Sequence, residues 1–412
     1  MQDGKIKILV IPDDYTGIAK FRSIGPHKYI QEHYGDEFII DIVYMKDVPK
    51  DDRADYFSQY DIIQYHKKFA NSLSDLELIK FLGIPTVIDV DDSYDLGPDH
   101  PLYLTAKKEH WKDIITKHIS MSDYVTTTTP LFANDLKKFN KNVYVFPNAI
   151  DPEEPQFVQK KTASDKIRFG IVCGSGHLAD IRLMEGIAAL PKEIRDKMQI
   201  VLCGFDTRGV MRTYKKNGEV EVNDLPPEKN TWTKYEEFLT NNYALVSPEH
   251  KAFLRKFMQV DDIFNNEFYV RKWTRDIQKY AKHYEGIDVL LAPLKENFFN
   301  YVKSELKEIE CGFTNTALIA QDYGPYKINL IPYIEKGGNI NPEGNALLVD
   351  PAKNHKQWAK YMKYVVEHPE CIQIMSNNLA KLVKENYTLE KVCAERVELY
   401  RKIIQEKCHQ KA

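Results

Sequence analysis

The sequence predicts an α/β protein made of two domains, each a doubly wound parallel sheet with helices on both faces. Three observations lead to this prediction. Over about the first 150 residues, short apolar strands alternate with amphipathic helices. The segment 147–166, PNAIDPEEPQFVQKKTASDK, is rich in proline and charge and has no period, which is typical of a linker. A second alternation of strands and helices begins directly after it.

Length and composition fit a soluble protein of this kind. A chain of 412 residues is too long for one ordinary core, and 28% charged with 43% hydrophobic residues is usual for globular proteins. A net charge of −3 argues against a general nucleic-acid binder. The start, MQDGKIKILVIP, leads straight into a strand without the pattern of a signal peptide. The six cysteines are scattered and form no CxxC pair, so we expect reduced thiols in a cytosolic protein.

The first domain is expected to span residues 1–155. Its predicted strands are KIKILVIP, FIIDIVYM, DIIQYH, PTVIDVDD, DYVTTTT and NVYVFPN. Helices are predicted at FRSIGPHKYIQEHYG, SLSDLELIKFLG and PLFANDLKKFN.

The second domain is expected to span residues 160–387. Its predicted strands are IRFGIVCGSG, MQIVLCGF, EFYVRKW, IDVLLAPL, TALIAQ and NALLVD, with a helix at DIRLMEGIAALP. Residues of about 207–268 break this rhythm and are interpreted as a helical insertion. The tail after NALLVD is helical, and its last helix, about 388–412, is expected to pack back on the first domain. Two such halves imply a cleft that encloses a ligand at the carboxyl ends of both sets of strands.

A glycine-rich loop, GSGHLAD, follows the first strand of the second domain. Gly174 and Gly176 permit close backbone approach, and Ser175 or free amides can hold an anion at the start of a helix. His177 could donate to a phosphate oxygen. The alternative is a capped turn with no ligand, because short glycine-rich loops are weak signals.

The stretch FNYVKSELKEIECG, residues 299–312, reads as the opening of a helix after IDVLLAPL. Lys303 and Lys307 repel each other one turn apart, and cations near a helix N-terminus oppose its dipole. With Ser304 and backbone amides they form an electropositive pocket that fits a diphosphate, and Glu310 could accept hydrogen bonds from a ribose. A solvated charged helix face is the alternative.

In the first domain, polar residues follow three strands. The turn around Gly17 can admit a sugar or phosphate. Asp89, Asp91 and Asp92 cluster at a strand end, where like charges are costly unless they are used. They could bind sugar hydroxyls, whereas a metal needs more oxygen ligands than the segment offers. His66 at the neighbouring strand end is more often a structural residue.

These motifs together resemble GT-B glycosyltransferases of the family-4 type. DYVTTTTPLFANDLKKFNKNVYVFPNAIDPEE resembles the end of their first domain, and GIDVLLAPLKENFFNYVKSELKEIECGFTNTALIAQDYGPY resembles their donor-binding segment. GSGHLAD resembles a G-S-x-x-H-x-x-D loop of enzymes that make bacterial cell-surface polysaccharides. The resemblance runs over most of the chain, and it implies the GT-B fold of two Rossmann-like domains that face each other across a cleft.

The resemblance also implies roles for single residues. Glu310 matches the second Glu of a Glu-(seven residues)-Glu pattern that binds the donor ribose, but Val302 stands where the first Glu is expected. Lys303 and Ser304 are therefore expected to act near the donor, and Asp91 aligns with a strand-end His of relatives. Three residues of the donor segment, Gly324, Pro325 and Tyr326, complete the expected nucleotide-sugar site.

The function implied is transfer of a hexose-like sugar, with retention, from a UDP- or GDP-type nucleotide-sugar donor to a hydroxyl of a saccharide or lipid-linked glycan acceptor. Asp91, Lys303 and Glu310 are the expected catalytic residues; no cofactor, no metal and no nucleic acid are expected. The alternatives are a nucleotide-sugar epimerase or hydrolase of the same fold and a non-catalytic partner subunit. A dehydrogenase is disfavoured because PDDYTG, not G-x-G-x-x-G, follows the first strand.

The expected location is the cytoplasm, with peripheral contact at the inner face of the membrane for a lipid-linked acceptor. Residues 1–150 hold 18 lysines and arginines against 23 aspartates and glutamates. That balance disfavours strong electrostatic docking on an anionic membrane. An apolar patch or a local basic helix could still serve.

Overall fold

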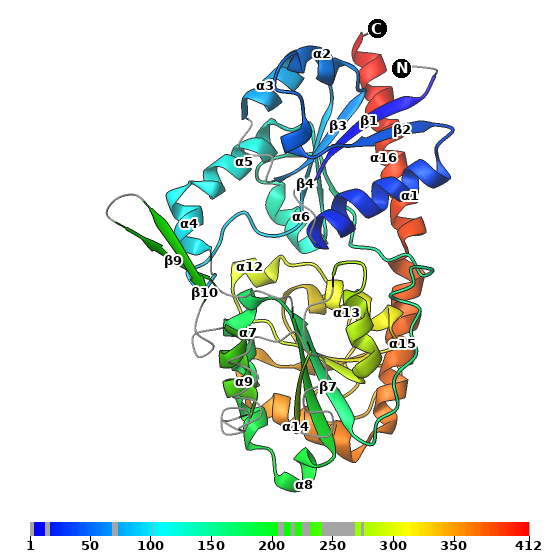
Figure 1. Ribbon diagram of the computed structural model, residues 1–412. Helices are drawn as coiled ribbons and strands as arrows, with labels where there is room; N and C mark the ends of the chain where they lie inside the picture. The colour runs from blue at the N-terminus through cyan, green and yellow to red at the C-terminus, as the bar shows by residue number, and fades with distance from the viewer. Residues whose placement is uncertain are drawn as a thin grey trace. The chain divides into compact units, whose positions relative to one another are not determined.

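A computed structural model describes residues 4–12, 17–67, 73–100, 102–204, 210–215, 219–224, 231–240, 268–272 and 276–411. The chain forms two compact units (Figure 1). Unit 1 consists of Met1–Glu154, Asn297–Ile309 and Val383–Ala412, and unit 2 consists of Pro155–Glu296 and Glu310–Leu382. The sequence prediction had assigned residues 297–309 to the second domain, whereas their contacts group them with unit 1.

Unit 1 is built on a six-stranded parallel sheet in the order β2-β1-β3-β4-β5-β6. The strands are β1 (Ile6–Ile11), β2 (Phe38–Ile42), β3 (Ile62–His66), β4 (Thr86–Val90), β5 (Tyr124–Thr127) and β6 (Val143–Val145). Runs such as IKILVI and TVIDV are buried almost throughout, as parallel strands covered on both faces require. All six predicted strands of the first domain are confirmed.

Helices cover both faces of this sheet. They are α1 (Gly25–His33), α2 (Arg53–Ser58), α3 (Leu73–Phe81), α4 (Tyr103–Lys108), α5 (Trp111–Met121), α6 (Pro130–Leu136) and α16 (Leu389–Lys411). A π-helical turn, Ala19–Ile24, leads into α1. The start of α6 is capped by Thr129, whose hydroxyl accepts the N–H of Phe132.

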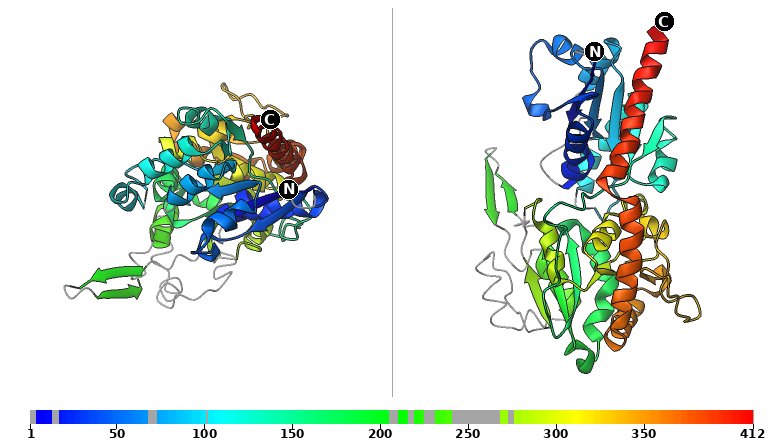
Figure 2. Two further views of the ribbon diagram at one scale, coloured as in Figure 1. Left: turned by 90° about the horizontal axis from the view of Figure 1, so that it is seen from above. Right: turned by 90° about the vertical axis from the view of Figure 1, so that its right-hand side faces the viewer.

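The long helix α16 packs beside α1. Figures 1 and 2 show it in red, running along the sheet of unit 1. Val397, Tyr400 and Ile403 on this helix are buried in the same apolar cluster as Ile8 and Val10 of β1. A segment from the end of the chain therefore completes one face of the first sheet.

Unit 2 repeats the architecture with a six-stranded parallel sheet in the order β11-β8-β7-β12-β13-β14. The strands are β7 (Ile167–Cys173), β8 (Met198–Gly204), β11 (Tyr269–Lys272), β12 (Val289–Ala292), β13 (Ala317–Gln321) and β14 (Leu347–Val349). All six match predicted strands, so the expected pair of doubly wound parallel sheets is confirmed.

The helices of unit 2 pack around one large apolar core that includes the fully buried Trp358. They are α7 (Leu178–Ile181), α8 (Lys192–Arg195), α9 (Thr231–Thr240), α14 (Lys356–Glu367) and α15 (Glu370–Asn386), which continues into unit 1. The 3-10 segments that join these elements include Arg182–Ala189, Tyr280–Gly286 and Gly324–Lys327. Among the described residues, no helix is both long enough and apolar enough to cross a membrane.

Two predictions about local structure are wrong. The described part of the 207–268 insertion is not wholly helical, because β9 (Val210–Tyr214) and β10 (Val220–Asp224) form an antiparallel pair before α9. The Asn-Gly dipeptide between these runs is a hairpin signal that the helical interpretation missed. The continuous helix expected over 299–312 is broken into α12 (Phe298–Tyr301) and α13 (Leu306–Phe313).

Each sheet has a topological switch point, where the connections from two adjacent strands lead in opposite directions along the sheet. In unit 1 it lies between β1 and β3, and in unit 2 between β7 and β12. In open α/β sheets, ligands bind outside the carboxyl ends of the strands at such a switch point. The loops after these strands are the ones that hold most of the predicted site residues.

Candidate functional site

The loop after β7 lies at the switch point of unit 2. It contains Gly174 and the single 3-10 turn Ser175–His177, which leads directly into α7. A Cβ atom added at Gly174 or Gly176 would meet no described heavy atom within 4 Å. The backbone here therefore borders open space on the side where a side chain would otherwise stand.

The tyrosine at position 235 closes this loop. Tyr235 on α9 is fully buried, its hydroxyl accepts the N–H of His177 at 3.0 Å, and it donates to the carbonyl of Gly174 at 3.1 Å. Burial raises the pKa of Tyr235, so the phenol stays protonated and can donate. One expected anion donor, the amide of His177, is thus already used inside the protein.

Asp180 joins the loops after β7 and β12. Its Oδ2 lies 2.8 Å from Nδ1 of His177, and its Oδ1 accepts the N–H of Lys295 at 2.7 Å. The carboxylate is 6% exposed, whereas the His177 side chain is 32% exposed. A buried carboxylate therefore holds a half-buried imidazole at the switch point of this sheet.

Glu310 is buried behind two tyrosines in unit 2. Its Oε1 accepts the hydroxyl of Tyr280 and its Oε2 accepts the hydroxyl of Tyr284, both at 2.6 Å. Burial raises the pKa of Tyr284 well above the ordinary value, and the nearby Glu310 carboxylate raises it further. Contact between Glu310 and a ribose would require one of these tyrosines to move, because the residue is 0% exposed.

Lys303, Ser304 and Lys307 are half-buried. The Nζ atom of Lys303 lies 4.9 Å from the ring centre of Phe299, within the range of a cation–π contact. Lys303 and Ser304 stand in the break between α12 and α13, and Lys307 lies in the first turn of α13. Lys303 therefore lies outside the helix that carries Lys307 and Glu310, and the two lysines are not one turn apart on a continuous helix as the sequence predicts.

Two residues in the break are buried in unit 1. Val302 is fully buried in the apolar cluster around Leu9, Tyr94 and Val125. Glu305 is 2% exposed, and its Oε2 has no hydrogen-bond partner among the described residues. Burial raises the pKa of Glu305 to about 7, and its own backbone N–H, Tyr387 and Arg22 only partly offset this.

The last predicted donor residues follow β13. Gly324 adopts a φ of 56°, a left-handed conformation that glycine tolerates at little cost. Pro325 and Tyr326 continue the 3-10 turn, and all three residues are buried. They shape the turn, and Tyr326 is 4% exposed, so its side chain offers little surface to a ligand.

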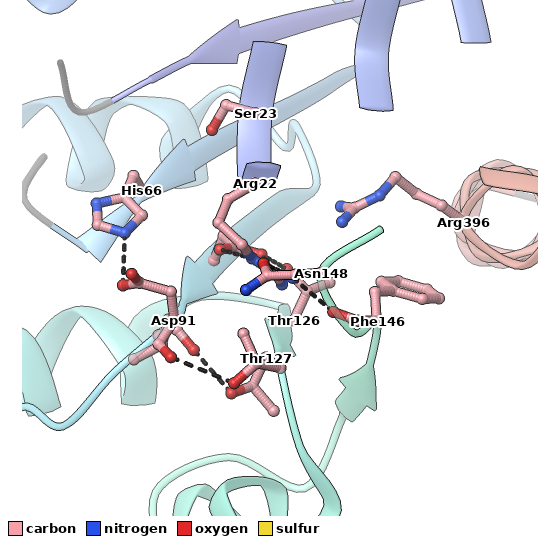
Figure 3. Close-up of polar contacts among 12 residues, drawn as sticks. Arg22, Ser23, His66, Asp91, Thr126, Thr127, Phe146, Asn148 and Arg396 are labelled. Carbon is pink, nitrogen blue, oxygen red and sulfur yellow. Dashed lines mark hydrogen bonds and ion pairs between the residues drawn. The ribbon is translucent and has the colours of Figure 1, made fainter. Parts of the chain in front are cut away.

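The carboxyl edge of the unit 1 sheet carries a cluster of charged residues (Figure 3). His66 at the end of β3 donates from Nε2 to Oδ1 of Asp91 at 2.9 Å, and Nζ of Lys67 lies 2.9 Å from the same oxygen. Lys67 also pairs with Asp92. Burial alone would raise the pKa of Asp91, but Lys67 and His66 hold it well below the ordinary value.

Asp89, one of the three clustered aspartates, is a structural residue. It is fully buried, and Arg22 donates to both of its oxygens, at 3.0 and 2.8 Å. Arg22 also donates to the carbonyl of Phe146 at 2.6 Å, as Figure 3 shows. Gly17 lies just before the π-helical turn that carries Arg22, and it is half-buried.

Four residues of these sites were not singled out from the sequence. Asp180 is the last residue of GSGHLAD, and Lys67 directly follows the predicted strand DIIQYH. Asp180 stands three residues after His177, a spacing that places both on one helix face. Glu305 lies three residues after Val302 and four before Ile309, which predicts an inward position. Nothing in the sequence pointed from Tyr235 to the loop it closes. Among the described residues, no group of three or more His, Cys, Asp or Glu side chains is placed to hold a metal ion.

Solved structures match the chain over nearly its full length. HepE from Anabaena in complex with UDP has 11% identity and a TM-score of 0.57, covering 97% of this chain and 100% of that one. Sucrose-phosphate synthase from Thermosynechococcus elongatus has 12% identity and a TM-score of 0.58, covering 98% and 100%. A UDP-forming α,α-trehalose-phosphate synthase from Burkholderia xenovorans has 10% identity and a TM-score of 0.56, covering 98% and 99%.

These matches establish that the chain has the GT-B glycosyltransferase fold, as the sequence resemblance implied. No protein-family model matches the sequence, and no curated relative was found. At 10–12% identity, the likeness concerns the arrangement of the chain and not its individual site residues.

Proposed function

We propose that this protein is a retaining glycosyltransferase. It would move a sugar from a UDP- or GDP-type nucleotide-diphosphate sugar to a hydroxyl of a saccharide or glycan acceptor. The observation that carries the proposal is the full-length likeness to GT-B structures, among them HepE with UDP, with UDP and glucose, and with UDP-glucose. The polar residues at the switch points of both sheets support it.

For the donor, the supporting features are those of an anion site. The open backbone at Gly174 and Gly176 and the half-exposed His177 border the switch point of unit 2. Lys303 and Lys307, with Ser304, would supply positive charge to the departing diphosphate. In such a reaction the protein mainly stabilises charge that grows on the leaving group.

For the acceptor, Asp91 is the best-supported residue. Because Lys67 and His66 keep its carboxylate ionised, it can accept a hydrogen bond from a sugar hydroxyl but cannot serve as an acid near neutral pH. During transfer the acceptor oxygen would bond to the anomeric carbon while the bond to the phosphate oxygen breaks. The departing diphosphate would take the hydroxyl proton. Protein cations would do the work that a metal ion does in other folds, so activity should survive EDTA.

One observation favours a second candidate, a nucleotide-binding partner subunit with little or no turnover. Val302 replaces an expected donor-binding Glu and is fully buried, and the oxygens of Glu310 accept from two tyrosines. Both features would weaken ribose and sugar binding relative to active enzymes of this fold.

A contact with an anionic membrane surface would suit a role in cell-surface polysaccharide synthesis. On and beside α4, Leu102 and Leu104 are 47% and 77% exposed, and Lys107 and Lys108 are also exposed. Apolar and basic residues together are what a peripheral membrane contact uses. Replacing both leucines with serine should reduce co-sedimentation with vesicles that contain an anionic lipid, and equal binding would exclude this surface.

The main experiment screens nucleotides and then products. Saturating UDP or GDP at a hundredfold excess over its dissociation constant should stabilise the protein by about 2.7 kcal/mol, seen as a rise in melting temperature. With the matching nucleotide sugar and a saccharide acceptor, a glycosylated product with the donor's anomeric configuration is expected. Turnover without acceptor would instead identify an epimerase or hydrolase, and binding without turnover a partner subunit. Absence of nucleotide binding would overturn the donor assignment.

A further inference from the structure

We propose that Asp180 is a positioning residue that holds His177 as a charged hydrogen-bond donor to the diphosphate of the donor. The inference rests on the proposed function and adds a residue and a pH dependence to it. It concerns only contacts inside unit 2.

The first step of the argument is geometric. Because an ionised carboxylate only accepts hydrogen bonds, the 2.8 Å contact requires the proton of His177 to sit on Nδ1, facing Asp180. A neutral imidazole would then carry no proton on Nε2. His177 can therefore donate from Nε2 to an anion only as an imidazolium.

The second step is electrostatic. Asp180 on α7 faces the imidazole of His177, and the hydroxyl of Tyr235 on α9 meets its backbone. Tyr235 is neutral, and it contacts His177 through the backbone. Asp180 brings a negative charge to within 2.8 Å of the ring, and in a half-buried position such a charge favours the imidazolium.

The third step is rigidity. The other oxygen of Asp180 accepts the N–H of Lys295, so the carboxylate cannot turn away from the imidazole without losing a buried hydrogen bond. The hydroxyl of Tyr235 holds the backbone of the loop, because it accepts the N–H of His177 and donates to the carbonyl of Gly174. The ring is held at the switch point between β7 and β12, beside the open space at Gly174 and Gly176.

The test measures the affinity of the full chain for UDP and for GDP by calorimetry between pH 5.5 and 9. In the wild type, affinity should fall as pH rises through the titration of His177. Asp180→Asn removes the charge, and while its amide oxygen accepts the N–H of Lys295 its NH2 group faces Nδ1 of His177. Both changes disfavour the imidazolium, so the fall should move to lower pH. At pH 7.5 the variant should bind about tenfold more weakly, the scale of one charge-assisted hydrogen bond. Near pH 5.5 the two proteins should differ least.

His177→Gln should bind weakly without this fall, and adding Asp180→Asn to it should change nothing further. Asp196→Asn is the matched control, because Asp196 forms an exposed ion pair with Lys192 on the same unit and should leave the profile unchanged. Ring-labelled histidine followed by NMR, assigned with His177→Gln, reports the Nδ1 proton and its titration without any ligand.

An unchanged pH profile in folded Asp180→Asn, or a wild-type profile in His177→Gln, overturns the inference while leaving the proposed function intact. If the wild type binds neither UDP nor GDP, the proposed function fails and the ligand role of His177 fails with it. If Asp180→Asn does not fold, the NMR titration and His177→Gln decide. A His177 ring protonated on Nε2 when neutral would overturn the proposal.

Discussion

Asp91 and Glu305 are both largely buried carboxylates of unit 1, yet their surroundings drive their ionisation in opposite directions. Asp91 receives hydrogen bonds from His66 and Lys67, so its charged form is favoured. Glu305 leaves one oxygen without a partner among the described residues, and burial raises its pKa to about 7. Asp91 is therefore ionised near neutral pH, whereas the charge of Glu305 depends on pH in that range.

Replacing Glu305 with glutamine should change how stability depends on pH. The folded wild type keeps the Glu305 proton up to about pH 7, whereas the unfolded chain loses it near the ordinary value of a carboxyl group. Stability of the wild type should therefore fall as pH rises through that window, by up to about 3 kcal/mol.

Glu305→Gln has no carboxyl group to lose a proton, so its free energy of unfolding should not fall in this way. The difference in stability in favour of the variant should therefore grow from pH 4 to pH 8. Urea unfolding across that range measures the difference between the two proteins. A difference that stays constant with pH would mean that Glu305 is ionised in the folded protein throughout.

Lys303→Ala should reduce turnover strongly while the protein remains folded. Removing one preorganised donor from a transition state of this kind costs on the order of 3 kcal/mol, or about a hundredfold in kcat. Steady-state rates at saturating donor are the measurement, and Lys353→Ala, an exposed lysine paired with Asp350, is the control. Near-normal turnover in Lys303→Ala would remove Lys303 from the catalytic assignment.

At the scale of elements, Arg22 ties the π-helical turn before α1 to the carboxyl edge of the sheet. It pairs with Asp89 at the end of β4 and donates to the carbonyl of Phe146 just after β6 (Figure 3). Thr126 of β5 adds a hydrogen bond to the same carboxylate at 2.6 Å. Three neighbouring strands and one helical turn therefore share a single buried ion pair.

Arg22→Met should destabilise the protein by about 3–5 kcal/mol, because it leaves the Asp89 carboxylate buried without its partner. Denaturant unfolding measures this, and adding Asp89→Leu should recover much of the loss. Lys112→Ala, which breaks an exposed pair with Asp95, should cost less than about 1 kcal/mol. Equal effects of Arg22→Met and Lys112→Ala would contradict the buried-pair account.

The break between α12 and α13 illustrates what a local pattern misses. Leu306, Ile309 and Phe313 predict a helix correctly, and α13 contains all three. Ser304 lies within the break, and serine favours helix caps over helix interiors. Val302 packs into the first core, a contact with distant residues that the local pattern does not report.

At the scale of the whole molecule, each unit has its own sheet and its own apolar cores. The first unit is nevertheless incomplete without the end of the chain. Tyr400 on α16 is fully buried and shares hydrogen bonds with His27 of α1 and Gln64 of β3. Arg401 on the same helix pairs with Glu37.

A chain that ends at residue 387 should therefore lose the structure of unit 1. Truncation removes the apolar side chains that α16 packs into this cluster, Val392, Cys393, Val397, Tyr400 and Ile403. It exposes the side chains that they cover, among them Ile8, Val10 and Ile30. Loss of several fully buried side chains at 1.5–3 kcal/mol each exceeds the stability of an ordinary domain. Proteolysis with mass spectrometry should find cleavage throughout residues 4–150, while a chain ending at residue 407 resists. Resistance of the shorter chain would contradict the role assigned to α16.

The strands and their pairing into two parallel sheets could be read from the sequence, because buried parallel strands are nearly continuous apolar runs with helices between them. The glycine loop, the Lys-Ser pair and the aspartate cluster could be named for the same reason: each directly follows such a strand. The β9–β10 pair could have been read from its Asn-Gly dipeptide.

The sequence does not tell which of these polar residues face solvent and which are hydrogen-bonded to buried partners inside the protein. Asp89 and Asp91 differ by two positions, yet one is locked to Arg22 and the other is partly exposed beside His66. Glu310 meets two tyrosines 26 and 30 residues earlier in the chain, and Tyr235 reaches a loop from about 60 residues away. Periodicity reports the contacts of near neighbours in the chain, whereas the ionisation and reach of a buried side chain depend on distant residues that only folding brings beside it.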